Sequence, residues 1–369
     1  MKGDLRIVHI IWSLGFGGIE TMLVNIANAQ AASGAHVSVM IINDSWEKPL
    51  FEGFDERVNK LLVHKRAGSG NPLFLIKLNR MLKKENPDII HAHGSDLWAL
   101  LVPSLRRKMV STLHDVPHGV IRRKGLIYRM LPILDQKQVS NVKNIDKVNQ
   151  VFAISQAVHD ELKANYGVES KVVVNGIPTA SFRQRGKREA GKPLRIVMIS
   201  RIVHEKKGQD LLIEAVAALK GKATADFIGI GESMDWLKQL ARDLKAEKWI
   251  TFLGKKSQKE IKQMLADYDL FAQPSRFEGF GLTVAEAMSA GVPVLVSEGQ
   301  GPSEVTCGNQ YGWTFRNGDS SDLKAKIAYI IDNYEEALDK AEKAINHVRN
   351  TYDVSITAKT YINEYQKDI

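Results

Sequence analysis

Strand-like runs of β-branched residues alternate with helix-like segments along this chain, and few folds accommodate such an alternation. In the first half the expected strands are residues 6–11, 36–42, 88–93, 110–114, 150–154 and 171–174. In the second half they are residues 194–200, 226–230, 250–253, 269–274 and 293–297. Strand–helix–strand repeats build parallel sheets that helices cover on both faces. The sequence therefore predicts an α/β protein.

The alternation is interrupted at residues 178–193, where Pro, Gly and charged residues replace the apolar periodicity. We expect a linker there, between an N-terminal domain of residues 1–177 and a C-terminal domain of residues 194–350, with a final helix at 351–369. Two domains also suit a chain of 369 residues. Because open parallel sheets bind ligands beyond the carboxyl ends of their strands, we expect a ligand-binding cleft between the domains.

The composition excludes several classes of protein. Cys307 is the only cysteine, so neither an intramolecular disulfide nor a zinc site of several cysteines can form. No apolar run approaches the roughly 18 residues that identify a membrane-spanning helix. We therefore expect a cytoplasmic protein. Aromatic and basic residues are not interleaved, which argues against nucleic acid as a partner.

Positive charge is concentrated in the first half of the chain. The net charge of +9 divides into +11 for residues 1–192 and −2 for residues 193–369. Residues 101–137 alone carry +6, and residues 73–84 resemble a helix with one apolar and one basic face. Such features attract phosphates and anionic lipids, so we expect a phosphorylated acceptor and peripheral contact with the inner face of the cell membrane. For residues 73–84, a core-facing helix with a solvated basic side is the alternative.

A strand, a glycine-containing loop and a helix follow one another between residues 269 and 290. The first amides of a helix have no partner within it and carry partial positive charge, so they can bind an anion. Gly279 and Gly281 leave room for an anion to approach. The amides within reach are those of Phe280, Gly281 and Leu282. This segment is a candidate phosphate-binding site.

Two carboxylates accompany this loop, Glu278 within it and Glu286 about one turn inside the helix. A carboxylate repels a phosphate, but it readily accepts hydrogen bonds from ribose hydroxyls. We therefore expect Glu286 to bind a ribose and Glu278 to face a sugar.

The string from Glu278 to Glu286 resembles the Glu-x7-Glu signature of the retaining glycosyltransferase family 4, as found in enzymes of bacterial surface-polysaccharide synthesis. Other segments resemble elements of that family and fall in the expected order: residues 15–20, 91–93, 112–115, 175–177, 200–210 and 229–232. The resemblance implies the GT-B fold, in which two Rossmann-like doubly wound domains face an interdomain cleft.

The resemblance also implies that Arg201 and a following lysine hold the diphosphate of the donor. Lys207 precedes Gly208 and matches best, but the spacing is one residue longer than usual, so Lys206 is the alternative. Cations and helix amides can neutralise the charge of a diphosphate leaving group. We therefore expect neither a metal nor another cofactor.

In the first domain the resemblance implies that His114 contacts the donor sugar and that Gly17 and Gly18 lie beside the phosphates. A buried structural histidine is the alternative for His114. An Asp-x-Asp sequence at 267–269 is interpreted as a turn, not a metal site. A zinc site is not expected either, although four histidines could be imagined to build one: His91, His93, His114 and His118.

These features together imply a retaining glycosyltransferase. It would move a sugar from a UDP- or GDP-sugar to a hydroxyl of a lipid-linked saccharide acceptor, in the assembly of capsule, lipopolysaccharide or glycolipid. A nucleotide-sugar epimerase or a phosphorylase of the same fold is the alternative among enzymes. A basic protein that binds nucleic acid is the alternative outside them.

Overall fold

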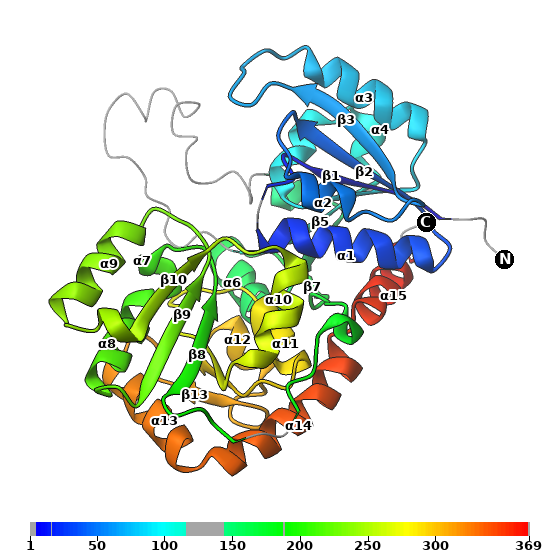
Figure 1. Ribbon diagram of the computed structural model, residues 1–369. Coiled ribbons are helices and arrows are strands. Elements are labelled where there is room, and N and C mark those ends of the chain that lie inside the picture. The colour runs from blue at the N-terminus through cyan, green and yellow to red at the C-terminus, as the bar shows by residue number, and fades with distance from the viewer. Residues whose placement is uncertain (1–4, 16, 116–143, 187–188, 368–369) are drawn as a thin grey trace. The chain divides into compact units, whose positions relative to one another are not determined.

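The computed structural model describes residues 5–15, 17–115, 144–186 and 189–367. The chain forms two compact units, one of Met1–Val174 with Thr357–Ile369 and one of Asn175–Ile356. Each unit contains one parallel sheet flanked by helices (Figure 1). The predicted architecture of two Rossmann-like α/β domains is confirmed.

The first unit is built on seven strands. They are β1 (Arg6–Ile11), β2 (His36–Asn43), β3 (Asn59–Lys65), β4 (Ile89–Ala92), β5 (Met109–Leu113), β6 (Gln150–Ala153) and β7 (Lys171–Val172). The α-helices are α1 (Gly18–Ala32), α2 (Lys48–Glu52), α3 (Phe74–Glu85), α4 (Pro103–Arg106), α6 (Gln156–Tyr166) and most of α15 (Val354–Tyr365). The 3-10 helices are η1 (Ser95–Leu100) and η3 (Ile145–Lys147). The strand order is β3-β2-β1-β4-β5-β6-β7.

Strand β1 lies inside this sheet and is buried in all but its first residue. A continuous apolar run of this kind suits a strand that is covered on both faces. Its parallel register places His9 beside Val39 on β2 and beside His91 on β4. The sheet thus brings two histidines together that are far apart in the sequence.

The second unit is built on six strands. They are β8 (Leu194–Ile199), β9 (Ala223–Ile228), β10 (Ile250–Gly254), β11 (Leu270–Gln273), β12 (Val294–Ser297) and β13 (Trp313–Phe315). The α-helices are α7 (His204–Lys207), α8 (Gln209–Ala218), α9 (Met234–Asp243), α10 (Gln258–Met264), α11 (Leu282–Ser289), α12 (Gly301–Val305), α13 (Ser320–Asp332) and α14 (Tyr334–Thr351). The 3-10 helices are η4 (Thr179–Ser181), η5 (Glu247–Trp249) and η6 (Leu265–Asp267). The strand order is β10-β9-β8-β11-β12-β13.

Two strands of the sheets were not anticipated from the sequence, β3 and β13. Strand β3 is only partly buried along most of its length, and β13 has three residues. Both lie at an end of their sheet, where one side of the strand has no neighbour. Edge strands lack the long apolar run that identifies an inner strand.

The segment expected to link the domains falls within the second unit. Arg185 forms an ion pair with Asp269 at 3.0 Å, and both side chains are almost fully buried. Phe182 is buried as well, and Thr179 donates a hydrogen bond to Asp353. Tertiary contacts of this kind have no local sequence pattern, so the Pro- and Gly-rich composition alone indicated a linker.

Helix α15 returns the end of the chain to the first unit, since the residues from Thr357 onward belong there. Tyr361 and Tyr365 are fully buried and pack against His91 and Phe152. The final helix expected at 351–369 is thus an integral part of the first unit. Across the described ranges of the chain, no helix combines the length and the apolar character that crossing a membrane requires.

Candidate active site

In the second unit, the segment after β8 and the segment after β11 pack together through their backbones. Gly208 has a φ of +70°, and a Cβ atom there would lie 2.0 Å from the carbonyl oxygen of Pro274. The carbonyl of Lys206 accepts a hydrogen bond from the amide of Arg276 at 2.9 Å. Only a glycine permits this approach. The structure therefore joins the predicted lysine pair to the predicted anion-binding loop.

Lys207 reaches the carboxylate of the loop. Its Nζ lies 2.5 Å from Oε2 of Glu278, and the two side chains are 11% and 20% exposed. Gln273 donates a hydrogen bond to the same oxygen at 2.9 Å, and Thr283 donates one to Gln273 Oε1 at 2.8 Å. The roles of Gln273 and Thr283 were not anticipated; their positions on either side of the glycine loop are the only sequence signal.

Helix α11 begins as predicted, with its amides open to a ligand. Gly281 precedes the helix with a φ of +98°. A Cβ atom there would lie 3.0 Å from Cγ of Pro302, so a larger residue would be strained and crowded. Within the described residues, the amides of Gly279, Phe280, Gly281 and Leu282 have no hydrogen-bond acceptor. Unpaired amides at the N-terminus of a helix are able to bind an anion.

Glu286 is a buried acid whose pKa is raised. Its side chain lies on α11, only 3% of the residue is exposed, and Oε2 has no hydrogen-bond partner among the described residues. Burial raises its pKa to about 7, while the positive charge of Lys262 acts in the opposite direction. A buried carboxyl oxygen without a partner is costly unless a ligand supplies the hydrogen bond.

Arg201 follows β8 with an exposed side chain. Its carbonyl accepts a hydrogen bond from Gln209 at 2.8 Å, which holds the backbone in place. Its guanidinium has no carboxylate partner among the described residues. The side chain is therefore available for an anion.

In the first unit, His114 directly follows β5 and is partly exposed. Its Nε2 lies 3.1 Å from Nδ1 of His93, and burial lowers the pKa of His114 to about 4. The ring is thus neutral at physiological pH. Gly17 precedes α1 and Gly18 opens it, and the carboxylate of Glu20 lies close to Gly17. The two glycines are therefore at a helix N-terminus, as predicted.

The two aspartates of the Asp-x-Asp sequence, interpreted above as turn residues, each form an ion pair with an arginine. Asp267 pairs with Arg183 at 2.5 Å, and Asp269 pairs with the buried Arg185. Asp269 also accepts hydrogen bonds from the amide of Arg195. Several basic residues of the segment 101–137 lie outside the described residues: Arg122, Arg123, Lys124, Arg129 and Lys137. His118, considered above as a zinc ligand, lies outside them as well.

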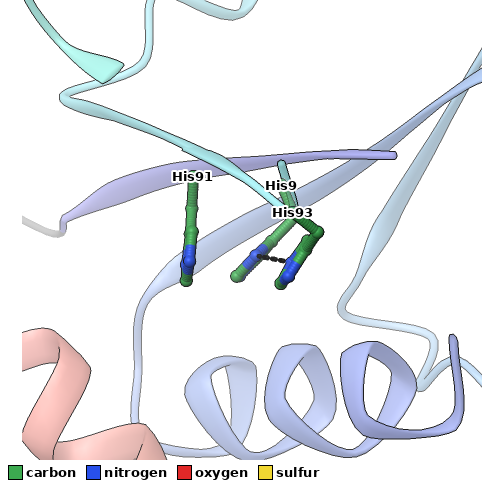
Figure 2. Close-up of side chains that lie close together, drawn as sticks. All are labelled: His9, His91 and His93. Atoms are coloured by element: carbon green, nitrogen blue, oxygen red, sulfur yellow. Dashed lines mark hydrogen bonds between the residues drawn. The ribbon is translucent and has the colours of Figure 1, made fainter. Parts of the chain in front are cut away.

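Histidines do gather in the first unit, but in a different combination from the one considered above. His9, His91 and His93 each have a ring nitrogen within 4.8 Å of the others, and they come from β1 and from the end of β4 (Figure 2). His9 was not anticipated in this cluster. The only sequence signal was a histidine in an otherwise apolar strand, because the pairing of β1 with β4 is visible only in the structure.

Two known families match successive parts of this chain. Residues 16–181 match Glycosyltransferase Family 4, and residues 181–349 match Glycosyl transferases group 1. The chain belongs to the GT-B glycosyltransferases. In this glycosyltransferase the change from one family match to the other falls close to the boundary between the two units.

Individual relatives and a solved structure agree with that assignment. A glycogen synthase of Mycobacterium tuberculosis is 26% identical over 401 aligned positions, which cover 97% of this chain and 94% of that protein. WcaL of Salmonella typhimurium, named as a colanic acid biosynthesis glycosyltransferase, is 30% identical over 210 positions, or 53% of this chain and 52% of that protein. The crystal structure of HepE from Anabaena in complex with UDP-glucose matches with a TM-score of 0.78 at 23% identity, over 99% of this chain and 100% of that chain.

Proposed function

We propose that this GT-B glycosyltransferase is a retaining, metal-independent enzyme that transfers a sugar from a UDP- or GDP-sugar to a hydroxyl of a saccharide acceptor. The observation that carries the proposal is the arrangement in the second unit. A lysine–carboxylate pair, open helix amides and a buried carboxylate lie on adjoining segments there. That combination suits a diphosphate next to a sugar hydroxyl.

Each group has a separate role in this proposal. The amides of Phe280, Gly281 and Leu282 bind the diphosphate together with Arg201. Glu286 accepts hydrogen bonds from the ribose, which supply the partner that its Oε2 lacks. The helix amides and Arg201 stabilise the negative charge that develops on the leaving diphosphate.

Lys207 and Glu278 act as a pair beside the reacting centre. The lysine adds positive charge for the leaving group, and the carboxylate keeps the lysine in place and faces the donor sugar. His114 contacts that sugar as a neutral imidazole, and Gly17 and Gly18 lie beside the phosphates. We assign no nucleophile of the enzyme: the acceptor hydroxyl bonds to the anomeric carbon on the face that the diphosphate leaves. The leaving phosphate oxygen takes the proton of that hydroxyl.

Donor binding is tested with a thermal-shift panel of UDP-, GDP- and ADP-sugars, because a ligand that binds the folded state raises its apparent stability. Arg201→Ala should weaken the affinity for the responding nucleotide by about 2–3 kcal/mol through the loss of a charge-assisted contact. Unchanged donor affinity in Arg201→Ala would contradict the assignment. Full activity after removal of metals with EDTA, and an NMR assignment of the product anomer, test metal independence and retention.

An epimerase or a phosphorylase is separated from a transferase by its products. Incubation of the donor without any acceptor should leave the nucleotide sugar unchanged. An epimerised nucleotide sugar, or a sugar phosphate formed only with inorganic phosphate, would instead support one of these two enzymes.

We further propose that the acceptor is lipid-linked and that α3 contacts the inner face of the membrane. Leu78 and Leu82 anchor this helix in the first unit. The preceding Leu73 is 64% exposed and Ile76 is 66% exposed, next to the exposed Lys77. Further exposed basic residues follow on the same helix: Arg80, Lys83 and Lys84. Exposed apolar side chains beside basic ones suit an anionic lipid surface.

Co-sedimentation with vesicles that contain anionic lipid tests this contact. The double variant Lys77→Glu/Lys84→Glu should release the protein from the vesicles, since each basic residue near such a surface contributes about 1 kcal/mol. The matched control is Lys324→Glu/Lys343→Glu, which reverses two exposed lysines of the second unit. Equal binding by both double variants, or binding to neutral vesicles alone, would contradict the proposal.

A further inference from the structure

A continuous chain of side-chain contacts runs from the interior of the first unit to His114. Nε2 of His114 lies 3.1 Å from Nδ1 of His93, and Nε2 of His93 lies 3.3 Å from Nδ1 of His9. Nε2 of His9 in turn lies 2.7 Å from Oε1 of Gln30 on α1. Figure 2 shows the middle of this chain, where the rings of His9 and His93 face one another.

This chain of side-chain contacts forms because three parallel strands place their carboxyl ends side by side. His9 lies on β1, His93 follows β4 and His114 follows β5, and these strands are neighbours in the sheet. The amide of His93 donates a hydrogen bond to the carbonyl of Ile10 at 3.3 Å. This hydrogen bond fixes the position of His93 along β1. Gln30 reaches the chain from the helix that follows β1. The geometry therefore depends on backbone that the sheet holds rigidly.

All three imidazoles of the chain are neutral. Burial lowers the pKa of His9 and of His114 to about 4, and it lowers the pKa of His93 well below the ordinary value. A neutral imidazole has one nitrogen that donates a hydrogen bond and one that accepts. The proton of each ring is therefore restricted to one of two positions, and each hydrogen bond in the chain allows only one donor.

The direction of the chain follows from its inner end. In the orientation that the Gln30 amide has in the structure, Oε1 faces His9 and Nε2 of Gln30 has no partner among the described residues. Because Oε1 can only accept, Nε2 of His9 carries the proton and Nδ1 of His9 accepts. Nε2 of His93 must then donate to His9, which leaves Nδ1 of His93 as an acceptor. Nε2 of His114 must donate to that atom. Nδ1 of His114 is left with a lone pair, and no described residue donates a hydrogen bond to it.

We propose that Gln30, His9 and His93 are positioning residues that hold His114 in the Nε2-protonated tautomer, so that its Nδ1 accepts a hydrogen bond from a substrate hydroxyl. This inference rests on the proposed function, in which His114 contacts the sugar. It adds the chemical class of the group recognised there: a hydrogen-bond donor. A substrate with only an acceptor at that position, such as a deoxyfluoro sugar, would be rejected because two acceptors would face one another.

A metal ion is the competing use of these histidines, since His9, His91 and His93 could supply three ligands. His91 argues against it, because both of its ring nitrogens are already engaged. Nε2 lies 2.7 Å from the hydroxyl of Thr112, and Nδ1 lies 2.5 Å from the hydroxyl of Tyr365. His91 belongs to the same histidine cluster, but it is not part of the series of hydrogen bonds that leads to His114. It therefore provides a control.

The tautomers are measured by 15N NMR of the free, full-length protein labelled at histidine, because the protonated and the bare nitrogen of a neutral ring differ widely in 15N shift. Signals are assigned from spectra of His93→Gln and His114→Gln. We expect His9, His93 and His114 all to carry the proton on Nε2. A proton on Nδ1 of His114, or a shift of the His9 and His93 signals by one equivalent of Zn²⁺, would overturn the inference.

Gln30→Met removes the acceptor at the inner end and preserves the volume of the side chain. It should populate both tautomers of His114 and lower kcat about tenfold, with the affinity for the nucleotide unchanged. His91→Gln disturbs the same buried cluster but should leave the tautomer of His114 as it is. An unchanged His114 spectrum in Gln30→Met would refute the inference. The wild-type spectrum tests the tautomer even if the variant does not fold or if no sugar transfer is found.

Discussion

At the scale of single residues, the candidate site contains groups that are unfavourable for the folded protein alone. Glu286 is buried with an unpartnered oxygen, and its pKa is raised to about 7. Lys207 and Glu278 are held together in a mostly buried ion pair. Such pairs and buried charges contribute little to stability, and they are costly when one partner is removed. Their presence on adjoining segments is best explained by a ligand.

Glu286 gives the first prediction at this scale. Its folded-state pKa of about 7 lies above the ordinary value of 4.5, so the folded state favours the protonated form. Its contribution to stability is therefore present below about pH 4.5 and is lost as the pH rises through about 7. Glu286→Gln should raise the free energy of unfolding by about 1–3 kcal/mol at pH 8, and by little at pH 4.

The same variant should bind the nucleotide less tightly, by roughly tenfold, because a neutral amide accepts a weaker hydrogen bond than a carboxylate does. Urea denaturation at the two pH values and titration with the nucleotide check both effects. A variant that is more stable at pH 8 and also binds as tightly as the wild type would show that Glu286 does not contact the ligand.

Lys207 and Lys206 give a paired prediction. Lys207→Ala leaves Glu278 without its cation and should lower kcat/KM on the order of 100-fold, or about 2.7 kcal/mol. Lys206 meets the loop through its carbonyl, which accepts hydrogen bonds from Arg276 and Phe277 and is retained in Lys206→Ala. That variant should stay within a few-fold of the wild type. Steady-state kinetics of the two variants decide the matter, and the reverse ranking would transfer the phosphate role to Lys206.

At the scale of elements, the candidate site depends on how the loop before α11 enters the helix. Gly281 combines a φ of +98° with close contact to Pro302, whereas Gly208 touches the carbonyl of Pro274. Gly208 packs the segment after β8 against the segment after β11, and Gly281 packs the loop after β11 against α12. The positions of the open amides follow from that packing, and so does the reach of Lys207.

Gly281→Ala tests this dependence. The variant should lose about 1–3 kcal/mol of stability from the left-handed backbone and the contact with Pro302, and its donor affinity should fall with it. Gly318→Ala is the matched control: its φ is +82°, but a Cβ atom there would meet no neighbour within 4 Å. The control should lose stability and keep the affinity. Equal donor affinity in the two variants would show that donor binding does not depend on the geometry of this loop.

At the scale of the whole molecule, the two units are not consecutive in the sequence. The first unit is completed by Thr357–Ile369, which follow the entire second unit. Tyr361 donates to or accepts from the hydroxyl of Thr112 at 3.0 Å, and Tyr365 bonds to His91 at 2.5 Å. Since both rings are fully buried, the end of the chain forms part of the core of the first unit.

Removal of residues 357–369 should therefore destabilise the first unit and leave the second folded. Loss of two buried aromatic side chains costs about 3–5 kcal/mol each, which is comparable to the stability of a whole domain. Limited proteolysis should then degrade the first unit and spare a fragment near residues 175–356. Tyr365→Phe, which removes one hydroxyl, should cause only a small loss. A truncated protein as resistant as the full chain would contradict this account.

The sequence by itself determined the α/β class, the presence of two sheets and the glycine loop before a helix, with its flanking acids. Each of these has a local signature: alternating strand and helix periods, glycines beside a helix start, and a fixed spacing from Glu278 to Glu286. Such signatures depend on neighbours within a few residues of one another, which a reader of the sequence can see.

Only the tertiary structure decided which lysine meets Glu278, where the first unit ends and how His9 joins His93 and His114. In a parallel sheet, neighbouring strands come from distant parts of the chain, and their order is set by packing over the whole domain. The contact between His9 and His93 spans 84 positions. No local pattern encodes a contact of that length, because its energy comes from the assembled sheet.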